Sequence, residues 1–209
     1  MSLANQTLLP KKIVLVDDNS TDETIEIVKK LAQKFSFIKV IRSKSSENHF
    51  PGKKVISAFN FGLKQLDDNY DVICKFDGDL IFPKQYLETI SHHYKNDPKL
   101  GMISGHCYIL NKNTWIYENI ASKSHTRGPI KSYRKSCFKD IGGLKVSEGW
   151  DTVDELIALY HGWYFKTDAS LKVKHLKPTG SNYKLNARYQ QGMALYKMRS
   201  SFLITVFSA

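Results

Sequence analysis

The sequence predicts an α/β protein: a mainly parallel, Rossmann-like sheet flanked by helices. Short apolar runs typical of strands alternate with segments whose apolar residues recur at helical spacing. Hydrophobic residues make up 42% of the chain and charged residues 24%, the balance of an ordinary globular protein. The 209 residues can bury a sizeable core and show no internal repeat, so we expect a single domain over residues 1–209.

The first half of the chain supplies three expected strands. Ile13–Val16 is too apolar to be half-exposed, which indicates a buried parallel strand. Ile38–Ile41 and Val72–Phe76 have a similar apolar character. Ser20 and Glu23 have the spacing of a capping box and predict the start of a helix. Helices are expected in three places: residues 20–35, 55–66 and 83–94.

The second half is less regular. Phe138–Gly143 predicts a short helix closed by glycine, and we expect residues 185–209 to be helical. The other expected elements are strands over residues 102–111, 116–120, 165 and 171–173, and a helix over residues 154–160.

The charge of the chain bounds its partners. A net charge of +11 favours an anionic partner, such as a nucleotide, nucleic acid or an acidic membrane surface. The basic residues are spread along the chain, which argues against a nucleic-acid-binding arm, so we expect no nucleic-acid partner. Cys74, Cys107 and Cys137 are an odd, scattered set without metal-binding spacing, which favours a reduced, cytoplasmic setting.

The two ends of the chain bear on membranes. No signal peptide opens the sequence, and no apolar run approaches the ~20 residues of a membrane span. An apolar run over residues 202–207 follows Lys197 and Arg199, a pattern that fits peripheral association with a membrane as well as packing on the core. The expected location is therefore cytoplasmic, with the inner face of the membrane as the variant to test.

Two acidic clusters stand where predicted strands end. Asp17 and Asp18 follow the first strand, and Asp77-Gly78-Asp79 follows the third. Ligands of open α/β sheets collect beyond the carboxyl ends of the strands. Two carboxylates around a glycine can hold a divalent cation that shares its oxygen ligands with a phosphate. The same residue types are common in turns, so the pattern alone leaves a purely structural role open.

Three further motifs follow in a fixed order. Gly52-Lys53-Lys54 opens a predicted helix, Tyr133-Arg134-Lys135 precedes Ile141-Gly142-Gly143, and Gly149-Trp150-Asp151 leads into a helix that ends near Gly162. Together with the acidic clusters, these motifs resemble the family 2 glycosyltransferases of GT-A fold from residue 11 to about residue 181. The resemblance implies a nucleotide-sugar-binding half (11–100), an acceptor and catalytic half (101–181) and a C-terminal helical segment (182–209).

The resemblance also implies roles for single residues. Asp79 would be the direct ligand of Mg²⁺ or Mn²⁺, with Asp77 and His175 as further ligands. Arg134 would hold a donor phosphate or an acidic acceptor. The implied nucleotide-sugar-binding residues are Asp17, Asp18, Lys53, Lys54, Asp77, Gly78 and Arg134. Capping turns and solvated surface residues are the ordinary alternatives for these positions.

Two departures from the family pattern matter. The family begins with a strand that supplies part of the nucleotide pocket, whereas Met1–Thr7 resembles the end of the helix after it, so we expect the first strand to be missing. Trp150 stands where the family has Glu. Asp151 is then the first candidate for the catalytic base, because its spacing to Gly162 matches the family's aspartate. Asp154 is its main rival, and Glu155 stays open.

The resemblance implies a metal-dependent, inverting glycosyltransferase that moves a sugar from a nucleoside-diphosphate donor to a hydroxyl of a glycan or lipid-linked acceptor, as in cell-surface polysaccharide biosynthesis. A catalytically inactive nucleotide-sugar-binding module is the alternative. Lys11–Asn19 also resembles the opening of a phosphorylation-receiver domain. That reading fails, because Ser57–Leu63 offers no acid for phosphorylation.

Overall fold

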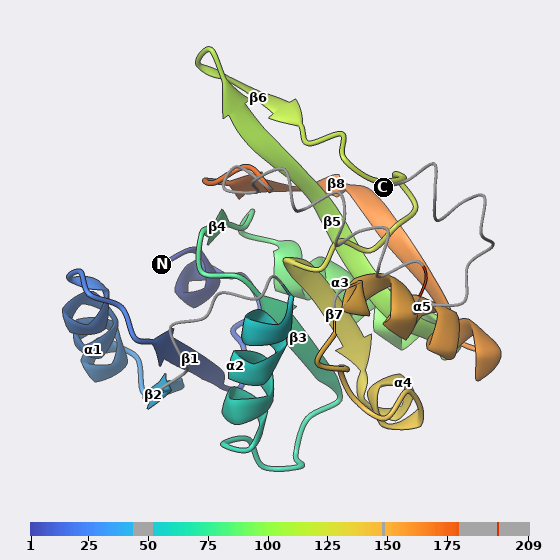
Figure 1. Cartoon of the computed structure of the whole chain (residues 1–209), viewed down its shortest axis with the longest axis horizontal. Helices are drawn as coiled ribbons and strands as arrows, with labels where there is room; N and C mark the ends of the chain where they lie inside the picture. Colours follow the sequence, from blue (N-terminus) through green and yellow to red (C-terminus); the bar gives the residue numbers. More distant parts are fainter. Residues whose placement is uncertain (44–51, 148, 180–195, 197–209) are drawn as a thin grey trace.

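A computed structural model describes residues 1–43, 52–147, 149–179 and Tyr196 (Figure 1). In chain order its elements are η1 (Ser2–Asn5), β1 (Ile13–Asp18), α1 (Thr24–Lys34), β2 (Ile38–Ser43), α2 (Lys53–Leu63), β3 (Val72–Phe76), β4 (Leu80–Ile81), α3 (Tyr86–Asn96), β5 (Leu100–Asn111), β6 (Thr114–Tyr117), β7 (Ile130–Arg134), α4 (Lys135–Asp140), α5 (Trp150–Tyr160) and β8 (Tyr164–His175). The predicted helix over residues 185–209 lies outside the described residues except for Tyr196, which is helical.

The predicted α/β class is confirmed, and its strands are mixed in direction. In the larger sheet the order is β3-β7-β5-β8-β4, with β6 beside β5. Within the described residues, the parallel pairs are β1–β2 and β5–β8, and the other pairs are antiparallel. The expectation of a mainly parallel sheet therefore holds for only part of the molecule. One reason is that β6 follows β5 after the two-residue turn Lys112-Asn113, which allows only an antiparallel pair, whereas β7 pairs with β3 and β5, to which it is not directly connected.

The strand β1 stands apart from the larger sheet. It pairs with β2 in register, with Ile13 opposite Ile38, and in the described part of the chain it has no other strand partner. Helix α2 lies against it: a side chain at Gly62 would come within 2.8 Å of Val16. The carboxyl end of β1 carries Asp17 and Asp18.

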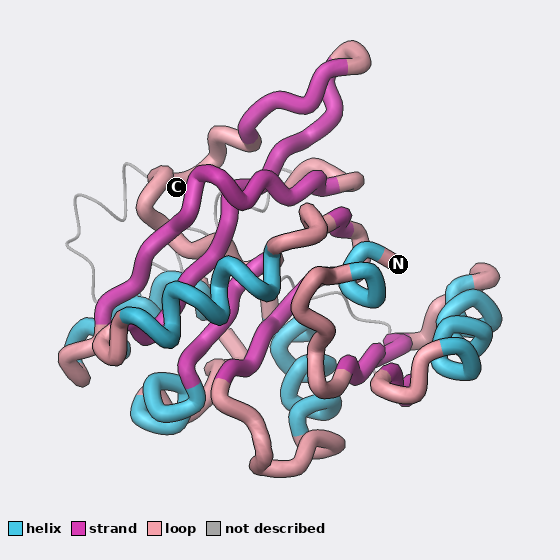
Figure 2. The backbone as a smooth tube through the Cα atoms, turned by 180° about the vertical axis from the view of Figure 1, so that it is seen from behind, coloured by secondary structure: helices cyan, strands magenta, loops and turns pink. Residues whose placement is uncertain are grey.

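Helices cover both faces of the larger sheet. Figure 2 shows α3 crossing one face, and Figure 1 shows α2, α4 and α5 on the other. On the α3 side, Tyr86, Ile90 and Tyr94 pack against buried residues of β5 and β8. On the other side, Ile56 of α2, Phe138 of α4 and Ala158 of α5 share a second core.

Strand β7 serves both layers, because successive side chains of a strand point to opposite faces. Ser132 faces α3, where its hydroxyl lies 3.2 Å from the Tyr94 hydroxyl. Lys131 and Tyr133 face α5, where both contact Asp154. This alternation places a buried lysine and a buried tyrosine beneath the acids of α5.

Local differences from the predicted elements have local causes. The helix α1 begins at Thr24 and not at Ser20, because the Ser20 N–H donates to Asp17 Oδ1 and the Thr24 N–H donates to Asp22 Oδ1. These two turns replace the predicted capping box. Helix α5 begins at Trp150, four residues earlier than predicted, after Gly149 in a left-handed conformation.

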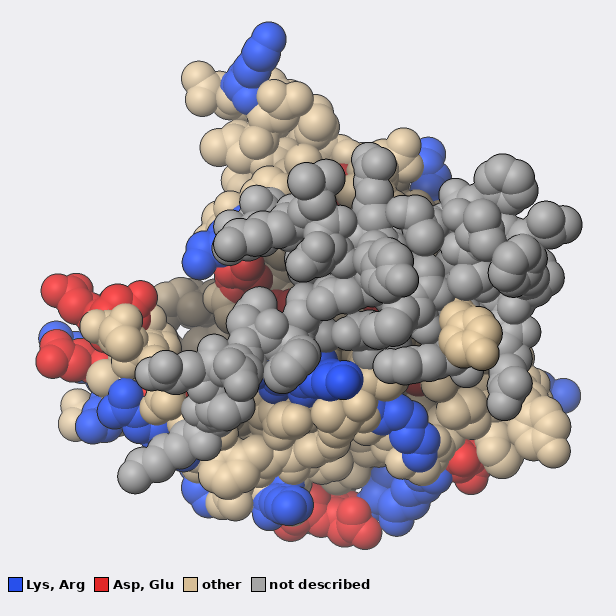
Figure 3. Space-filling view, viewed as in Figure 1, with Lys and Arg blue, Asp and Glu red and all other residues tan. Residues whose placement is uncertain are grey.

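The surface agrees with the scattered basic residues of the sequence. In Figure 3, Lys and Arg side chains are spread over the described part of one face, from the tip of the β5–β6 hairpin to the side of α4. Within the residues that the structure describes, every helix is too short or too polar to cross a membrane.

Candidate active site

Asp77, Gly78 and Asp79 lie in the turn between β3 and β4. The Asp77 N–H donates to the Pro129 carbonyl at 3.0 Å, which fixes the end of β3 beside the loop before β7. The Asp77 and Asp79 side chains are 30% and 31% exposed, so a ligand can reach both. Apart from Asp77 and Asp79, no heavy atom of the described residues lies within 4 Å of where a side chain at Gly78 would begin, as expected if the glycine leaves room for an anion. Buried Lys75 forms an ion pair with Asp77 Oδ1.

His175 ends β8 beside this turn. The pairing of β4 with β8 sets Leu80 opposite His175, and the Leu176 N–H donates to the Asp79 carbonyl at 2.9 Å. His175 Nε2 lies 3.7 Å from Asp79 Oδ2, which is longer than a hydrogen bond. The structure thus brings together Asp79 and His175, two of the residues expected to bind a metal.

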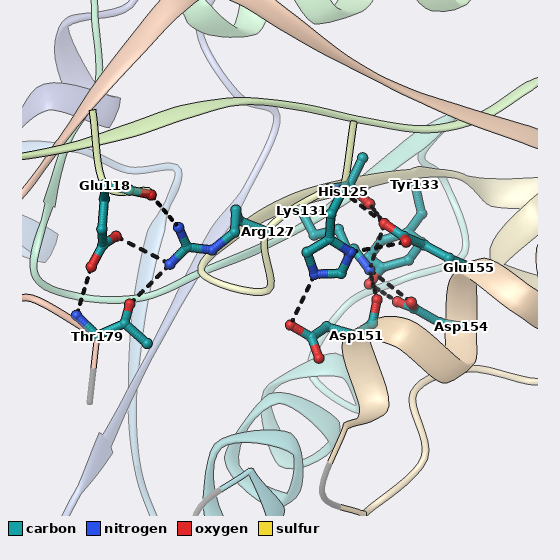
Figure 4. A network of polar contacts seen from close by, with 10 residues as sticks. Glu118, His125, Arg127, Lys131, Tyr133, Asp151, Asp154, Glu155 and Thr179 are labelled. Carbon is teal, nitrogen blue, oxygen red and sulfur yellow. Dashed lines mark hydrogen bonds and ion pairs between the residues drawn. The ribbon is translucent and has the colours of Figure 1, made fainter. Parts of the chain in front are cut away.

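Behind His175 lies a set of polar residues that we call the Glu118 cluster: buried Glu118, buried Arg127 and exposed Thr179 (Figure 4). Glu118 Oε2 lies 3.0 Å from His175 Nδ1 and 3.1 Å from Arg127 Nη2, and Glu118 Oε1 accepts the Thr179 N–H at 2.7 Å. Burial would raise the pKa of Glu118, but these donors lower it to about 2. The contact with Glu118 raises the pKa of His175 in turn.

The donor set beside the turn suits a hard or borderline divalent cation. Two reachable carboxylates and one imidazole are ligands that Mg²⁺ and Mn²⁺ accept, and a second group of possible ligands, Cys107, Glu118 and His175, converges within 4.8 Å. Cys107 is buried, and burial raises the pKa of its thiol to about 12, so the thiolate form is disfavoured. The residues present therefore fit a cation at Asp79 and His175 better than one at Cys107.

A second acidic site lies on α5. Asp151 and Glu155 stand four residues apart and so share one face of the helix. His125 reaches both, with Nδ1 2.9 Å from Glu155 Oε2 and Nε2 3.5 Å from Asp151 Oδ2. Asp154 points at β7, where it accepts from Lys131 Nζ at 2.7 Å and from the Tyr133 hydroxyl at 2.5 Å (Figure 4).

The three acids of α5 differ in access. The Asp151 side chain is 31% exposed, whereas those of Asp154 and Glu155 are 4% and 8% exposed. Both carboxylate oxygens of Asp154 are taken by Lys131 and Tyr133. Of the three, Asp151 is therefore the one that a ligand can contact directly.

Electrostatics separate the same acids. Burial raises the pKa of Asp154 to about 6, even beside Lys131. Burial also opposes the ionisation of Asp151, but the hydrogen bond from His125 and the charge of Lys131 outweigh it and lower the Asp151 pKa. Burial would lower the pKa of His125, but its two carboxylate partners raise it to about 9. His125 is therefore a cation at neutral pH, and Asp151 is an ionised carboxylate.

The two acidic sites adjoin each other across Trp150 and Gly128. Lys75, the partner of Asp77, and Lys131, the partner of Asp154, lie over the Trp150 ring at 5.2 and 5.7 Å from its centroid. A side chain at Gly128 would meet the Trp150 ring at 2.9 Å and Asp151 Oδ2 at 3.1 Å. The next residue, Pro129, accepts the Asp77 N–H, so Asp151 and the Asp77 turn border the same loop.

Asp17 and Asp18 form the third acidic group, at the end of β1. Asp17 is buried, and its Oδ2 lies 3.2 Å from Arg42 Nε. Asp18 Oδ2 lies 3.3 Å from Lys54 Nζ at the start of α2. The buried Asp18 Oδ1 has no hydrogen-bond partner among the described residues. Lys53 begins α2, after Gly52 at a positive φ of 79°, a conformation that favours glycine.

Arg134 lies at the end of β7 that is away from the Asp77 turn. The antiparallel register sets Arg134 opposite Val72, at the start of β3, whereas Asp77 follows the other end of that strand. Its guanidinium donates to the carbonyls of Tyr94, Asp97 and Leu100, next to the end of α3. Arg134 thus ties α3 to the sheet, and its expected role in holding a donor phosphate or an acidic acceptor stays a prediction.

Several polar residues of these sites were not predicted. Lys131 lies in the mixed polar and apolar strand Ile130–Arg134, where a lysine is not unusual, so its burial was not signalled by the sequence. Tyr133 belonged to a recognised motif but was given no role. His125, Glu118 and Arg127 lie in loops, and nothing in their spacing announces that they meet acids far along the chain.

The fold and the clustered acids define a class, the GT-A glycosyltransferase fold. Two solved glycosyltransferases share it at low identity. The mannosyltransferase PcManGT from Pyrobaculum calidifontis, solved with GDP-Man and Mn²⁺, has a TM-score of 0.68 at 14% identity over 96% of this chain and 59% of its own. GalNAc-T7, solved with UDP, GalNAc and Mn²⁺, has a TM-score of 0.62 at 12% identity over 88% of this chain and 41% of its own.

The sequence assigns the family. The model for glycosyl transferase family 2 matches residues 1–146, and the chain therefore belongs to that family. A curated relative, the poly-beta-1,6-N-acetyl-D-glucosamine synthase of Staphylococcus aureus strain COL, is 34% identical over an alignment that covers 87% of this chain. The chain spans 47%, about half, of the length of that synthase.

Proposed function

We propose that this chain is the catalytic domain of a metal-dependent, inverting glycosyltransferase that uses a nucleoside-diphosphate sugar. The observation that carries the proposal is the placement of a reachable carboxylate, Asp151, against the same loop as the Asp77–Asp79 turn. A glycosyltransferase needs this arrangement, because the base that activates the acceptor must lie near the donor's diphosphate.

The donor would bind along the carboxyl ends of β1 and β3. The buried oxygen of Asp18 without a partner is an acceptor for a base or ribose donor group. Lys54, now paired with Asp18, and Lys53 beside it would meet the diphosphate or the base edge. The mannosyltransferase and GalNAc-T7 structures, which contain GDP-Man and UDP, support a nucleotide-sugar donor here.

Asp79, Asp77 and His175 would hold the divalent cation, Mg²⁺ or Mn²⁺. When bound, such a cation neutralises charge that builds on the leaving diphosphate. The chain's own contribution is to hold two reachable carboxylates and one imidazole beside an open glycine. Both similar solved structures contain Mn²⁺, which supports the assignment.

Asp151 would act as the general base. Its lowered pKa keeps it ionised, so it can accept the proton of an acceptor hydroxyl as that oxygen attacks the anomeric carbon from the side opposite the diphosphate. The attack forms the new glycosidic bond, breaks the sugar–phosphate bond and inverts the anomeric carbon. Asp154, the rival, has both oxygens occupied by Lys131 and Tyr133 and would act in positioning.

The acceptor would be a growing glycan or a lipid-linked sugar. The relative from Staphylococcus aureus is a synthase of a polysaccharide, which supports a hydroxyl of a glycan and a role in making a cell-surface polymer. Association with the inner face of a membrane and a cytoplasmic location belong to this proposal.

Nucleotide binding tests the proposal. A panel of nucleoside diphosphates should raise the melting temperature with one preferred base, and more so with Mn²⁺, because a ligand of the native state stabilises it by mass action. Asp79→Ala should remove the Mn²⁺-dependent part of this shift and leave the fold intact, since the side chain is partly exposed. A folded Asp79→Ala variant with unchanged Mn²⁺ dependence would remove the metal role.

Donor hydrolysis separates the enzyme from the inactive binding module. A working site transfers some sugar to water, and this leak should depend on Asp151. Binding of the nucleotide sugar without any hydrolysis or transfer would favour the inactive module.

A further inference from the structure

The Glu118 cluster lies directly behind His175, and the function proposed above gives it no task. Glu118 is 2% exposed and far from the Asp77 turn in sequence, yet its carboxylate meets the imidazole on the side away from Asp79. A buried carboxylate is retained at a cost unless its partners compensate for it. The position of Glu118 against the imidazole suggests that it orients the His175 ring.

Main-chain contacts fix the position of the His175 backbone, but they do not fix the orientation of its imidazole ring. The β4–β8 pairing and the Leu176 N–H bond to the Asp79 carbonyl hold the backbone of His175 beside Asp79. An imidazole can still rotate and present either nitrogen. Something else must decide which nitrogen faces Asp79.

The contact with Glu118 determines which nitrogen of His175 faces Asp79. An ionised carboxylate only accepts hydrogen bonds, so the Nδ1 atom that lies 3.0 Å from Glu118 Oε2 must carry the proton. In the neutral ring, Nε2 then has a free lone pair, and it points toward Asp79 Oδ2 at 3.7 Å. A lone pair facing a carboxylate repels it, unless a cation lies between the two.

Glu118 is itself held in place from three directions. Its Oε1 accepts the Thr179 N–H at 2.7 Å, and its Oε2 accepts Arg127 Nη2 at 3.1 Å. Arg127 also donates to the Glu118 carbonyl at 3.4 Å and to Thr179 Oγ1 at 2.9 Å. The Glu118 N–H donates to the Cys107 carbonyl on β5 at 2.9 Å. The carboxylate therefore cannot turn away from His175 without breaking several hydrogen bonds.

We propose that Glu118, held by Arg127 and the Thr179 N–H, is a positioning residue that fixes the His175 ring with Nε2 toward the cation site at Asp79. The proposal rests on the metal role of Asp79 and His175 in the proposed function. In metal sites, a ligating histidine commonly donates its other ring N–H to a carboxylate, which sets the tautomer and the ring orientation.

A competing arrangement uses the same residues differently. Cys107, Glu118 and His175 converge within 4.8 Å and could bind a cation directly. Arg127 already supplies a positive charge to Glu118 at 3.1 Å, which opposes a second cation there. Cys107→Ala separates the two arrangements, because it removes a ligand from the competing site only.

The first test measures the ring itself in the metal-free protein. With ¹⁵N-labelled histidine at alkaline pH, where the ring is neutral, wild-type His175 should carry its proton on Nδ1. Glu118→Ala should move the proton toward Nε2, where Asp79 can accept it. Asp168→Asn is the matched control, because Asp168 makes the same kind of contact with His93, at 2.8 Å, away from the site. It should alter His93 and leave His175 unchanged.

A second variant is needed in case Glu118→Ala does not fold. The double change Glu118→Met with Arg127→Met replaces the buried ion pair by apolar side chains of similar size, which is often neutral for stability. It should show the same shift of the His175 proton as Glu118→Ala. An unchanged His175 tautomer in either folded variant would overturn the proposal.

The second test measures Mn²⁺ affinity in the presence of a nucleoside diphosphate by titration calorimetry. Loss of the orienting carboxylate should weaken Mn²⁺ binding about 10–100-fold. Asp168→Asn and Cys107→Ala should leave it unchanged. Mn²⁺ affinity that falls with Cys107→Ala as much as with Glu118→Ala would overturn the proposal in favour of the competing site.

The two tests also separate this proposal from the proposed function. Absence of Mn²⁺-dependent binding in the wild type would overturn the metal role. In that case the His175 tautomer still decides whether Glu118 orients the ring: a shift in Glu118→Ala supports the orientation, and no shift refutes it.

Discussion

The acids of α5 and the acids at the end of β1 are both buried or half-buried, but they differ in how their oxygens are satisfied. Asp154 and Glu155 have every carboxylate oxygen engaged by Lys131, Tyr133, His125 or Thr126. At the end of β1, Asp18 has one oxygen paired with Lys54 and one buried oxygen that no described residue reaches with a hydrogen bond. An unpaired buried acceptor costs stability, so this difference supports the proposal that Asp18 binds a ligand, whereas Asp154 and Glu155 are satisfied by their own neighbours.

Asp151 differs from the other two acids of α5, because its side chain is 31% exposed. If it is the base, Asp151→Asn should lower turnover by ~10²–10⁴-fold, the usual contribution of a positioned general base. Donor affinity should barely change, since Asp151 meets the acceptor. Steady-state kinetics with calorimetry of donor binding would check this. A stronger loss in Asp154→Asn than in Asp151→Asn would transfer the role to Asp154.

Because every carboxylate oxygen of Asp154 and Glu155 has a partner, we expect a large stability effect at Lys131. Lys131 is fully buried and pairs with Asp154, so Lys131→Met leaves a buried carboxylate without its cation. Unfolding in urea should show a loss of about 3–5 kcal/mol. Lys139→Met is the control: its pair with Asp68 is exposed, and its loss should change stability by about 0–1 kcal/mol. Equal effects at both lysines would contradict the buried pair.

His125 gives the α5 site a dependence on pH. Its pKa is about 9 in the folded protein and 6.5 in its ordinary state, so its stabilising effect is complete below pH 6.5 and is lost as the pH rises through 9. The loss should be on the order of 3 kcal/mol. Unfolding curves of wild type and His125→Gln should converge toward high pH. Parallel curves across this range would refute the assignment, and exposed His161 serves as the control position.

At the end of β1 we expect a smaller effect, on nucleotide binding by Asp18. Asp18→Asn should weaken nucleotide binding about tenfold, because the amide replaces an acceptor that the ligand would use. Stability should fall by only about 0–1 kcal/mol, because the substitution removes the charge of one partly exposed ion pair, with Lys54, while Oδ1 has no hydrogen-bond partner among the described residues. Asp67→Asn should leave binding unchanged, because Asp67 lies in an exposed turn next to Lys11 and Lys12, before the start of β1 and not at its carboxyl end. Calorimetry that finds equal nucleotide affinity in Asp18→Asn and wild type would remove Asp18 from the site.

Much of the fold could be predicted, because apolar runs and helical spacing are local properties. The strands β1, β2 and β3 and the helices α2 and α3 lie close to where their residues predict them. The start of α1 could not be predicted, because a capping box at Ser20 and the two turns at Asp17 and Asp22 use the same residue types. The direction of β7 depends on its distant partner β3, and sequence spacing does not report it.

The positions of some site residues were likewise predictable from local sequence, and those of others were not. Asp77 and Asp79 follow a predictable strand, whereas the place of His175 beside them was implied by the family resemblance and not by strand ends. The position of Arg134 could not be predicted, because it depends on the register of β7 against β3. Glu118 and His125 come from loops whose paths are fixed by tertiary contacts, so only the structure shows what they meet.

The two-sided use of β7 limits how this part of the chain can change its length. A one-residue insertion within Ile130–Arg134 would exchange the faces of the strand and turn Lys131 toward α3, away from Asp154. The tip of the β5–β6 hairpin at Lys112 and Asn113 is exposed and makes no such contact in the described structure. Related sequences should therefore vary in length at that tip and keep the length of β7 constant.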